Sequence, residues 1–437
     1  MWTSEQEVDV KHLKPGMYVS RLDRPWIGTS FPIQGFYVQD IGDVEKIQRY
    51  CEHVFIDVYK SNRSPACSNN LTLSGDTKPK ANKLTSKSVV EQLRKRATEK
   101  YTITNSFKRE IAQAVPILKN LQDEMQHLMA PRGYIDRHNF RKLANQCSDL
   151  VESVIRNPDA MVWLCRVKQN NTLVYRHALR LALLGCLVGR QFGLNRFLMV
   201  DLTLALLMTG IGKSLIRQDV LDNVRFNHAP AAYQQHVHLS LDRISKIQLP
   251  GINIGDIIAN YCERMDGSGY PLGKTSEDIP LLASIAGLIE CFELQVNPYN
   301  PNYAVAPSDA ITELNRVKNT LFDPALVEKF VHTIGIYPTG TLVELNDQRI
   351  GIVCSQSYER RLRASIIPLT TRHGQAVEKF KIVDLFLPNQ WQLNNNKIRI
   401  TKGLPISTLP PPLLDAAYGW LIKKNYGVWG KMTGLLS

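Results

Sequence analysis

The most specific run of residues in this chain lies between Glu263 and Pro271 and reads Glu-Arg-Met-Asp-Gly-Ser-Gly-Tyr-Pro. Its two glycines permit a tight turn, and the Tyr-Pro step fixes how the chain leaves that turn. A loop of this kind can present side chains to a ligand or a partner protein, or it can serve only as a rigid turn. We predict ligand or partner binding for Asp266, Gly267, Ser268, Gly269, Tyr270 and Pro271.

A second candidate for chemistry is Lys213, which follows the apolar run from Leu202 to Gly212. An ammonium group can pair with a phosphate as a point charge, so Lys213 is a predicted contact for an anionic ligand. It can also be the cation that ends a helix, where it complements the helix dipole. The sequence alone leaves both roles open.

The eight cysteines offer little chemistry by their spacing, because no two of them form a C-x-x-C pair. Scattered cysteines of this kind indicate reduced thiols rather than disulfides or a structural zinc site. We expect most of them to be small core residues. They are Cys51, Cys67, Cys147, Cys165, Cys186, Cys262, Cys291 and Cys354.

Composition and charge narrow the class of protein. The 437 residues are 44% hydrophobic and 21% charged, which is typical of a soluble protein with a sizeable core. The longest charge-free apolar runs are shorter than the ~20 residues of a membrane span. Because the N-terminus is acidic and polar, unlike a secretory signal, we predict a cytoplasmic protein.

The net charge of +13 suits a nucleic acid, a membrane surface or an anionic ligand such as a cyclic dinucleotide. The basic residues are most frequent between Lys78 and Lys100, where Tyr101 is the nearest aromatic residue. Aromatic residues interleaved with basic ones are typical of single-stranded nucleic-acid binding, and this basic stretch contains none. We therefore interpret this stretch as a solvated linker and regard nucleic-acid binding as the weaker hypothesis.

The surrounding elements form a mainly α protein. Residues 6–60 alternate short β-like runs with turns and one short helix, which predicts a small α+β module. Residues 61–87 are poor in large apolar side chains and predict a flexible linker. Helical periodicity dominates residues 88–336, strand patterns follow over 337–403, and a tail with a triple proline occupies 404–437.

The loop from Glu263 to Pro271 resembles the signature of HD-GYP domains. Further matches, in the order found in that family, extend the resemblance over roughly residues 100–400. They are Asn157 to Leu194, Ile211-Gly212-Lys213, Phe322-Asp323 and Gly335-Ile336-Tyr337-Pro338. The N-terminal module resembles the small domain of unknown function that precedes many HD-GYP domains, through Leu13 to Met17, Asp23 to Trp26 and Gly35-Phe36.

The resemblance implies an HD-superfamily helical domain with a small C-terminal β subdomain. It also implies hydrolysis of cyclic di-GMP, which HD-GYP enzymes perform with a cluster of two or three metal ions. In such a cluster a bridging carboxylate and several imidazoles hold the metals and lower the pKa of a bridging water. Each ligand position can be read in this chain.

Most of these ligands are replaced. The His-Asp pair of the family corresponds to Thr209-Gly210, so the bridging carboxylate is absent. The His-His pair corresponds to Tyr261-Cys262, which removes two imidazoles. Two divalent cations would face too little negative charge to offset their dehydration. The resemblance therefore predicts a degenerate site with no metal cofactor.

A few ligand positions keep a related side chain. His236 matches the family outright, Glu290 and Glu293 stand where the family has aspartates, and Tyr299 replaces an arginine that contacts phosphate. A single soft metal on His236, Cys262 and Glu290 is a weaker alternative to plain packing roles for these residues, since Cys and His both bind zinc. A divalent metal ion (Fe, Mn or Zn) is thus the alternative cofactor.

Two further histidines are of interest. His177 lies in an apolar helical run where the family also carries histidine, and functional and structural roles are equally compatible with it. His238 cannot share a helix face with His236, so we expect it to be exposed.

The leading functional hypothesis is a catalytically inactive HD-GYP-like protein in cyclic di-GMP signalling. It would act as a receptor for the nucleotide or as an adaptor for another signalling protein, since in the family the loop is implicated in contacts with GGDEF-type cyclase domains. The alternative is an active metal-dependent cyclic di-GMP phosphodiesterase with an atypical metal site. Nucleic-acid binding through the basic linker is a third and weaker hypothesis.

Overall fold

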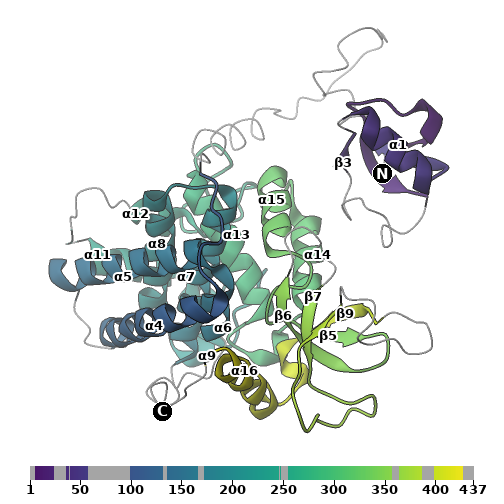
Figure 1. Ribbon diagram of the computed structural model, residues 1–437. Coiled ribbons are helices and arrows are strands. Elements are labelled where there is room, and N and C mark those ends of the chain that lie inside the picture. The colour runs from purple at the N-terminus through teal and green to yellow at the C-terminus, as the bar shows by residue number, and fades with distance from the viewer. Residues whose placement is uncertain are drawn as a thin grey trace, which may run out of the picture. The chain divides into compact units, whose positions relative to one another are not determined.

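In the computed structural model the chain forms two compact units, residues 1–81 and 82–437. The structure describes residues 5–23, 36–38, 40–57, 99–130, 135–165, 172–245, 247, 254–356, 364–385 and 398–426. The predicted linker over 61–87 lies outside these residues, as do the first residues of the predicted helical domain, up to 98, and the end of the tail. Figure 1 shows the described elements.

The N-terminal unit is a small α+β module. Its antiparallel sheet has the order β1 (Glu5–Asp9), β4 (His53–Asp57), β2 (Tyr18–Leu22) and β3 (Phe36–Tyr37). The single-turn η1 (Val10–His12) follows β1, and α1 (Ile41–Tyr50) precedes β4. Buried apolar side chains from the sheet and from α1 form one common core, so the module has a core of its own.

The second unit is mainly helical, as predicted. Its first five helices begin at polar N-cap residues whose side chains accept hydrogen bonds from the first turn, which explains where each helix starts. They are α4 (Phe107–Met129), α5 (Arg137–Arg156), α6 (Pro158–Leu164), α7 (Leu173–Phe192) and α8 (Arg196–Lys213). Gly193 adopts φ 77° and ends α7.

The remaining helices complete the bundle around two central ones. They are α9 (Gln218–Leu221), α10 (Ala231–Gln234), α11 (His236–Ile244), α12 (Gly255–Asn260), α13 (Leu281–Val296), α14 (Pro307–Val317) and α15 (Pro324–Ile334). α8 and α13 are apolar on nearly every side, and such helices are stable only when neighbouring helices surround them. Figure 1 shows both in the interior of this unit.

A five-stranded antiparallel sheet follows α15. Its order is β8 (Val383–Asp384), β7 (Ala364–Pro368), β6 (Ile350–Gln356), β5 (Leu342–Leu345) and β9 (Ile400–Leu404). The predicted C-terminal β subdomain is therefore present as an antiparallel sheet. The tail adds a helix, α16 (Pro411–Tyr426), which begins at the triple proline because proline suits the first turn of a helix.

The sheet, α16 and the helical bundle share a core. Trp163 of α6 is fully buried, donates its indole N–H to the carbonyl of Cys354 over 2.9 Å, and packs edge-on against Tyr418 of α16. The mainly α fold with a small C-terminal β subdomain and an N-terminal α+β module is thus confirmed. Within the described residues, no helix is both long enough and apolar enough to cross a membrane.

Candidate functional site

The predicted site residues lie where α7, α8, α11 and α13 meet the chain around residues 261–271. At its centre is Lys213, the last residue of α8, whose side chain is fully buried. Its Nζ donates to both carboxylate oxygens of Glu290 on α13, at 2.8 Å each. The ammonium predicted as a ligand contact is therefore committed to an internal ion pair.

Glu290 is surrounded by further donors. His177 of α7 approaches Oε1 with its Nε2 at 3.2 Å, and the Tyr233 hydroxyl donates to the same oxygen at 3.4 Å. Burial pushes the pKa of Glu290 upward, but the charges of Lys213 and then of His177 outweigh burial and hold that pKa well below its ordinary value. Glu290 is therefore an ionised carboxylate, because its partners favour the charged form.

His236 is neutral, and both of its nitrogens have partners. Nδ1 lies 2.6 Å from the carbonyl oxygen of Tyr233, which can only accept, so Nδ1 carries the proton. Nε2 then accepts a hydrogen bond from the hydroxyl of Tyr261. Burial, followed by the charge of Lys213, lowers the pKa of His236 to about 3. The lone pair that would bind a metal is thus directed at a tyrosine.

Cys262 lies beside this histidine, with its Sγ 4.0 Å from Nε2 of His236. Burial raises the pKa of the Cys262 thiol to about 11, so the group stays protonated at neutral pH. A metal ligand or nucleophile must be a thiolate. The cysteine therefore lacks the charge that either role requires.

Packing closes Thr209 and Gly210, the positions that the resemblance aligns with a His-Asp pair. A Cβ atom placed on Gly210 would lie 2.5 Å from the Cβ of Ala178 on α7, so no larger side chain fits there. The Thr209 hydroxyl donates to the carbonyl of Leu206 in its own helix, over 2.7 Å. Helix packing thus occupies the space of the bridging carboxylate.

Glu293 and Tyr299, the two remaining positions that the resemblance aligns with the family, also have packing roles. Glu293 pairs with Arg180 of α7 instead of joining Glu290. Tyr299 packs against His177 with ring centroids 4.9 Å apart. Neither side chain adds an acid to the centre of the cluster.

These residues do not fit a divalent metal ion. Of the three candidates, Glu290 binds an ammonium, His236 accepts from a tyrosine, and Cys262 is a protonated thiol. Within the described part of the chain, no group of three or more His, Cys, Asp or Glu side chains is arranged to hold a metal. We name the set formed by Lys213, Glu290, His177, His236, Tyr233, Tyr261 and Cys262 the buried polar cluster.

The loop over residues 263–272, called the Gly-Tyr-Pro loop from here on, is rigid and has an inner and an outer side. The Glu263 carboxylate is buried and accepts from the backbone N–H groups of Leu272 and Lys274, at 2.8 and 2.9 Å. Gly267 adopts φ 78°, and a Cβ on Gly269 would lie 2.4 Å from the backbone N of Arg264, so both positions require glycine. The loop geometry is therefore dictated by its own sequence.

The inner side of this loop carries Tyr270, whose ring lies 6.1 Å from that of His236 and meets it edge-on. The step to Pro271 is a cis peptide bond. The outer side carries Asp266 and Ser268, which hydrogen-bond to each other over 2.6 Å, and Leu272, which is 69% exposed. The predicted loop residues are thus divided between the buried polar cluster and the solvent.

Sequence reasoning missed Tyr233, which contacts both Glu290 and His236. It stands in an Ala-Ala-Tyr-Gln run on a four-residue helix, and nothing in that run signals a functional position. His238 is exposed, as predicted.

Comparisons with known proteins identify two family models that match this chain. Residues 5–157 match the family model of the domain of unknown function DUF3391, and residues 167–326 match that of the HD domain. The first match thus runs beyond the small N-terminal module, through α4 and α5.

Several curated relatives carry the name cyclic di-GMP phosphodiesterase. PA4108 of Pseudomonas aeruginosa is 28% identical over 54% of this chain and 59% of its own length. The response regulator RpfG of Xanthomonas campestris pv. campestris is 30% identical over 32% of this chain and 38% of its own length. The matched part thus spans less than two thirds of either relative.

Among solved structures, Bd1817 of Bdellovibrio bacteriovorus, described as an HDG"Y"P protein, covers 75% of this chain and 98% of its own length. Its sequence identity is 12% and its TM-score is 0.41, a likeness too low to support an argument about this chain.

Proposed function

The chain carries a DUF3391 domain followed by an HD domain similar to those of HD-GYP proteins, and on that premise we propose that it is a catalytically inactive member acting in cyclic di-GMP signalling. The observation that carries the proposal is the ion pair between Lys213 and Glu290. An ammonium group supplies one positive charge and no Lewis acidity. It therefore cannot lower the pKa of a water or stabilise an in-line displacement as a metal pair does.

Gly210 supports the same conclusion from packing. The bridging carboxylate expected in the family has no room there, because Ala178 occupies the space. Loss of charge and loss of space together argue that the cluster stabilises the fold and performs no hydrolysis.

The adaptor role is better supported than the receptor role. Lys213, the predicted nucleotide contact, is fully buried and paired, so a phosphate would have to displace Glu290 from it. The outer side of the Gly-Tyr-Pro loop, in contrast, presents Asp266, Ser268 and Leu272 on a backbone fixed by Glu263. Rigid exposed loops lose little entropy on binding a partner. A GGDEF-type cyclase domain is the partner class we propose.

The first test is hydrolysis of cyclic di-GMP by the full chain with Mn²⁺ and, anaerobically, with Fe²⁺. We expect no linear pGpG and no GMP, with PA4108 as the positive control. The active-phosphodiesterase alternative rests on the names of the curated relatives. It would be upheld if a linear product formed and disappeared in the Glu290→Gln variant.

The second test separates adaptor from receptor. Calorimetric titration with cyclic di-GMP should give no saturable heat. Binding of purified GGDEF-type domains should be lost in Leu272→Arg, which changes the outer side of the loop only. Tyr270→Ala is a poorer probe, since Tyr270 packs on His236. Saturable nucleotide binding with no response to Leu272→Arg would favour the receptor instead.

A further inference from the structure

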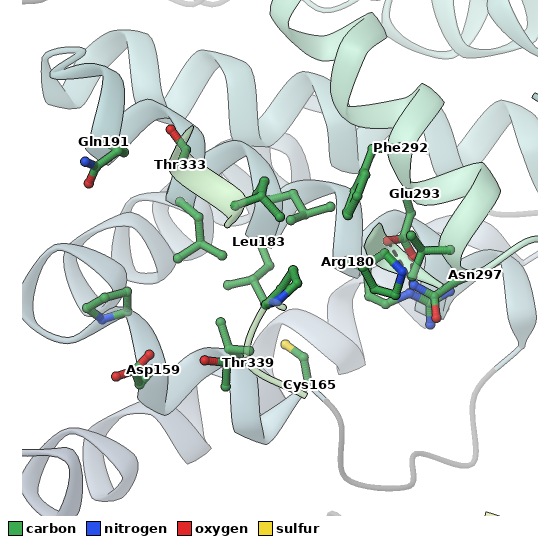
Figure 2. Close-up of a pocket in the computed structure, with 18 of the residues that line it drawn as sticks. Asp159, Cys165, Arg180, Leu183, Gln191, Phe292, Glu293, Asn297, Thr333 and Thr339 are labelled. Atoms are coloured by element: carbon green, nitrogen blue, oxygen red, sulfur yellow. Dashed lines mark hydrogen bonds and ion pairs between the residues drawn. The ribbon is translucent and has the colours of Figure 1, made fainter. Parts of the chain in front are cut away.

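A cavity separate from the buried polar cluster lies between α6, α7, α13 and the end of α15 (Figure 2). Its volume is about 110 Å³, and it opens to the surface. Its wall is apolar where Leu183, Leu184 and Leu187 of α7 face Val162 of α6. A cavity of about 150 Å³ with a similar lining holds benzene, so this one has room for an apolar group of about four or five carbon atoms.

On one side of the cavity the charged and polar side chains are already paired with one another. Arg180 donates to Glu293, which also accepts from Asn297 over 3.1 Å. Figure 2 shows these three side chains grouped together, with Asp159 on the opposite side and Leu183 between. A ligand gains little from groups that already satisfy one another.

The opposite side of the cavity contains the carboxylate of Asp159. Asp159 lines the cavity with its side chain partly exposed, and the group that hydrogen-bonds to Asn157 is its backbone N–H, not its carboxylate. Arg190, whose Nε donates to the carbonyl of Ile155 over 3.3 Å, lies near enough to favour the Asp159 anion. Burial is nevertheless the larger influence and raises the pKa of Asp159 to about 6. The group that lacks stabilisation in this cavity is therefore an anion.

We propose that the cavity is a binding site for a small organic ammonium compound, with a branched aliphatic body against Leu183, Leu184 and Leu187 and its cationic group at Asp159. An ammonium group would give the Asp159 carboxylate a charge-assisted hydrogen bond inside the cavity. A carboxylate ligand would instead add a third acid to Asp159 and Glu293. The site is independent of the function proposed above, since it shares no residue with the buried polar cluster or with the Gly-Tyr-Pro loop.

The test measures binding of 3-methylbutylamine to the full chain by ligand-observed NMR. Two probes of similar shape serve as controls, the neutral 3-methylbutan-1-ol and the anion 3-methylbutanoate. We expect saturable binding of the amine, with the alcohol and the carboxylate each about tenfold weaker or more, as for loss of a charged hydrogen bond.

Three variants assign the site. Asp159→Asn keeps the shape and should weaken amine binding about tenfold or more. Val162→Phe should abolish binding by filling the cavity while keeping the charge. Asp219→Asn, at an exposed position on α9, should leave binding unchanged. The proposal is overturned if the three probes bind equally, if the carboxylate binds best, if Asp159→Asn binds the amine as tightly as wild type, or if no probe binds saturably.

Discussion

The helices α7 and α13 line two interiors of opposite character. Through His177 and Glu290 they contribute to the buried polar cluster, where charged and aromatic side chains fill the space. One turn further along both helices, Arg180 and Glu293 form a boundary, and beyond it the leucines of α7 face a cavity. The difference teaches that side chains fill the region where the resemblance places catalysis, whereas the cavity lies in another part of the same helices.

The largest expected effect comes from removing the central cation of the filled region. Lys213→Met would leave Glu290 as a buried charge without its main partner, and we expect unfolding in urea to require about 3–5 kcal/mol less free energy. The double variant Lys213→Met with Glu290→Met should recover most of that loss, because two apolar side chains can replace a buried pair.

The exposed pair of Arg316 and Glu313 provides the matched control. Arg316→Met should leave the urea midpoint unchanged, since surface pairs contribute little. An equally mild Lys213→Met would show that the buried polar cluster is not held by this ion pair.

A smaller effect is expected at Gly210. Its α-hydrogen faces Ala178, and Gly210→Ala should cost about 3 kcal/mol of unfolding free energy, the upper part of the range for overpacked cores. Adding Ala178→Gly should restore much of the stability, because it removes the atom that clashes. If Gly210→Ala is neutral by thermal denaturation, the region is not closed as described.

Acid should weaken the filled region through His236. Its folded pKa of about 3 lies below the unfolded value near 6.5, so the unfolded chain binds the extra proton between these values. Stability is therefore present above pH 6.5 and is lost as pH falls, by about 2 kcal/mol between pH 7 and pH 5 from this group alone. The lowered pKa of His177 acts in the same direction.

Urea midpoints at pH 7, 6 and 5 measure this loss. His236→Gln should flatten the dependence, and the exposed His238→Gln should retain the wild-type slope. A flat wild-type profile over this range would contradict a buried neutral His236.

The smallest effect is expected when the same valine-to-isoleucine substitution is made at the open cavity and at a tightly packed position. Val162→Ile adds a methylene group to the cavity wall and should raise stability by about 0.5 kcal/mol. Val237→Ile adds the same group to a fully buried position on α11, where we expect a loss of about 1 kcal/mol. Thermal denaturation of both variants should shift in opposite directions, and a shared sign would remove the contrast between open and filled space.

The fold class was predictable because helical and strand periodicities are local, and the loop from Glu263 to Pro271 carries its own turn chemistry. The contacts of Lys213 were not predictable, since Glu290 lies 77 positions away and only the packing of α8 against α13 joins them. The sequence did not locate strand β9 individually, because Ile400-Thr-Lys-Gly-Leu lacks a clear alternation. The cavity gave no sequence signal, because its wall combines residues from five helices and from the segment after α15.

The contact between Gly210 and Ala178 also bears on how reversible the proposed loss of the metal site would be over evolutionary time. Replacing Gly210 with aspartate alone would introduce a clash before any metal could repay it. A lineage would first have to pass through Ala178→Gly, which by itself loosens the seam between α7 and α8 and brings no benefit. Each route back therefore begins with a step that selection for stability opposes, so the packing acts as a ratchet.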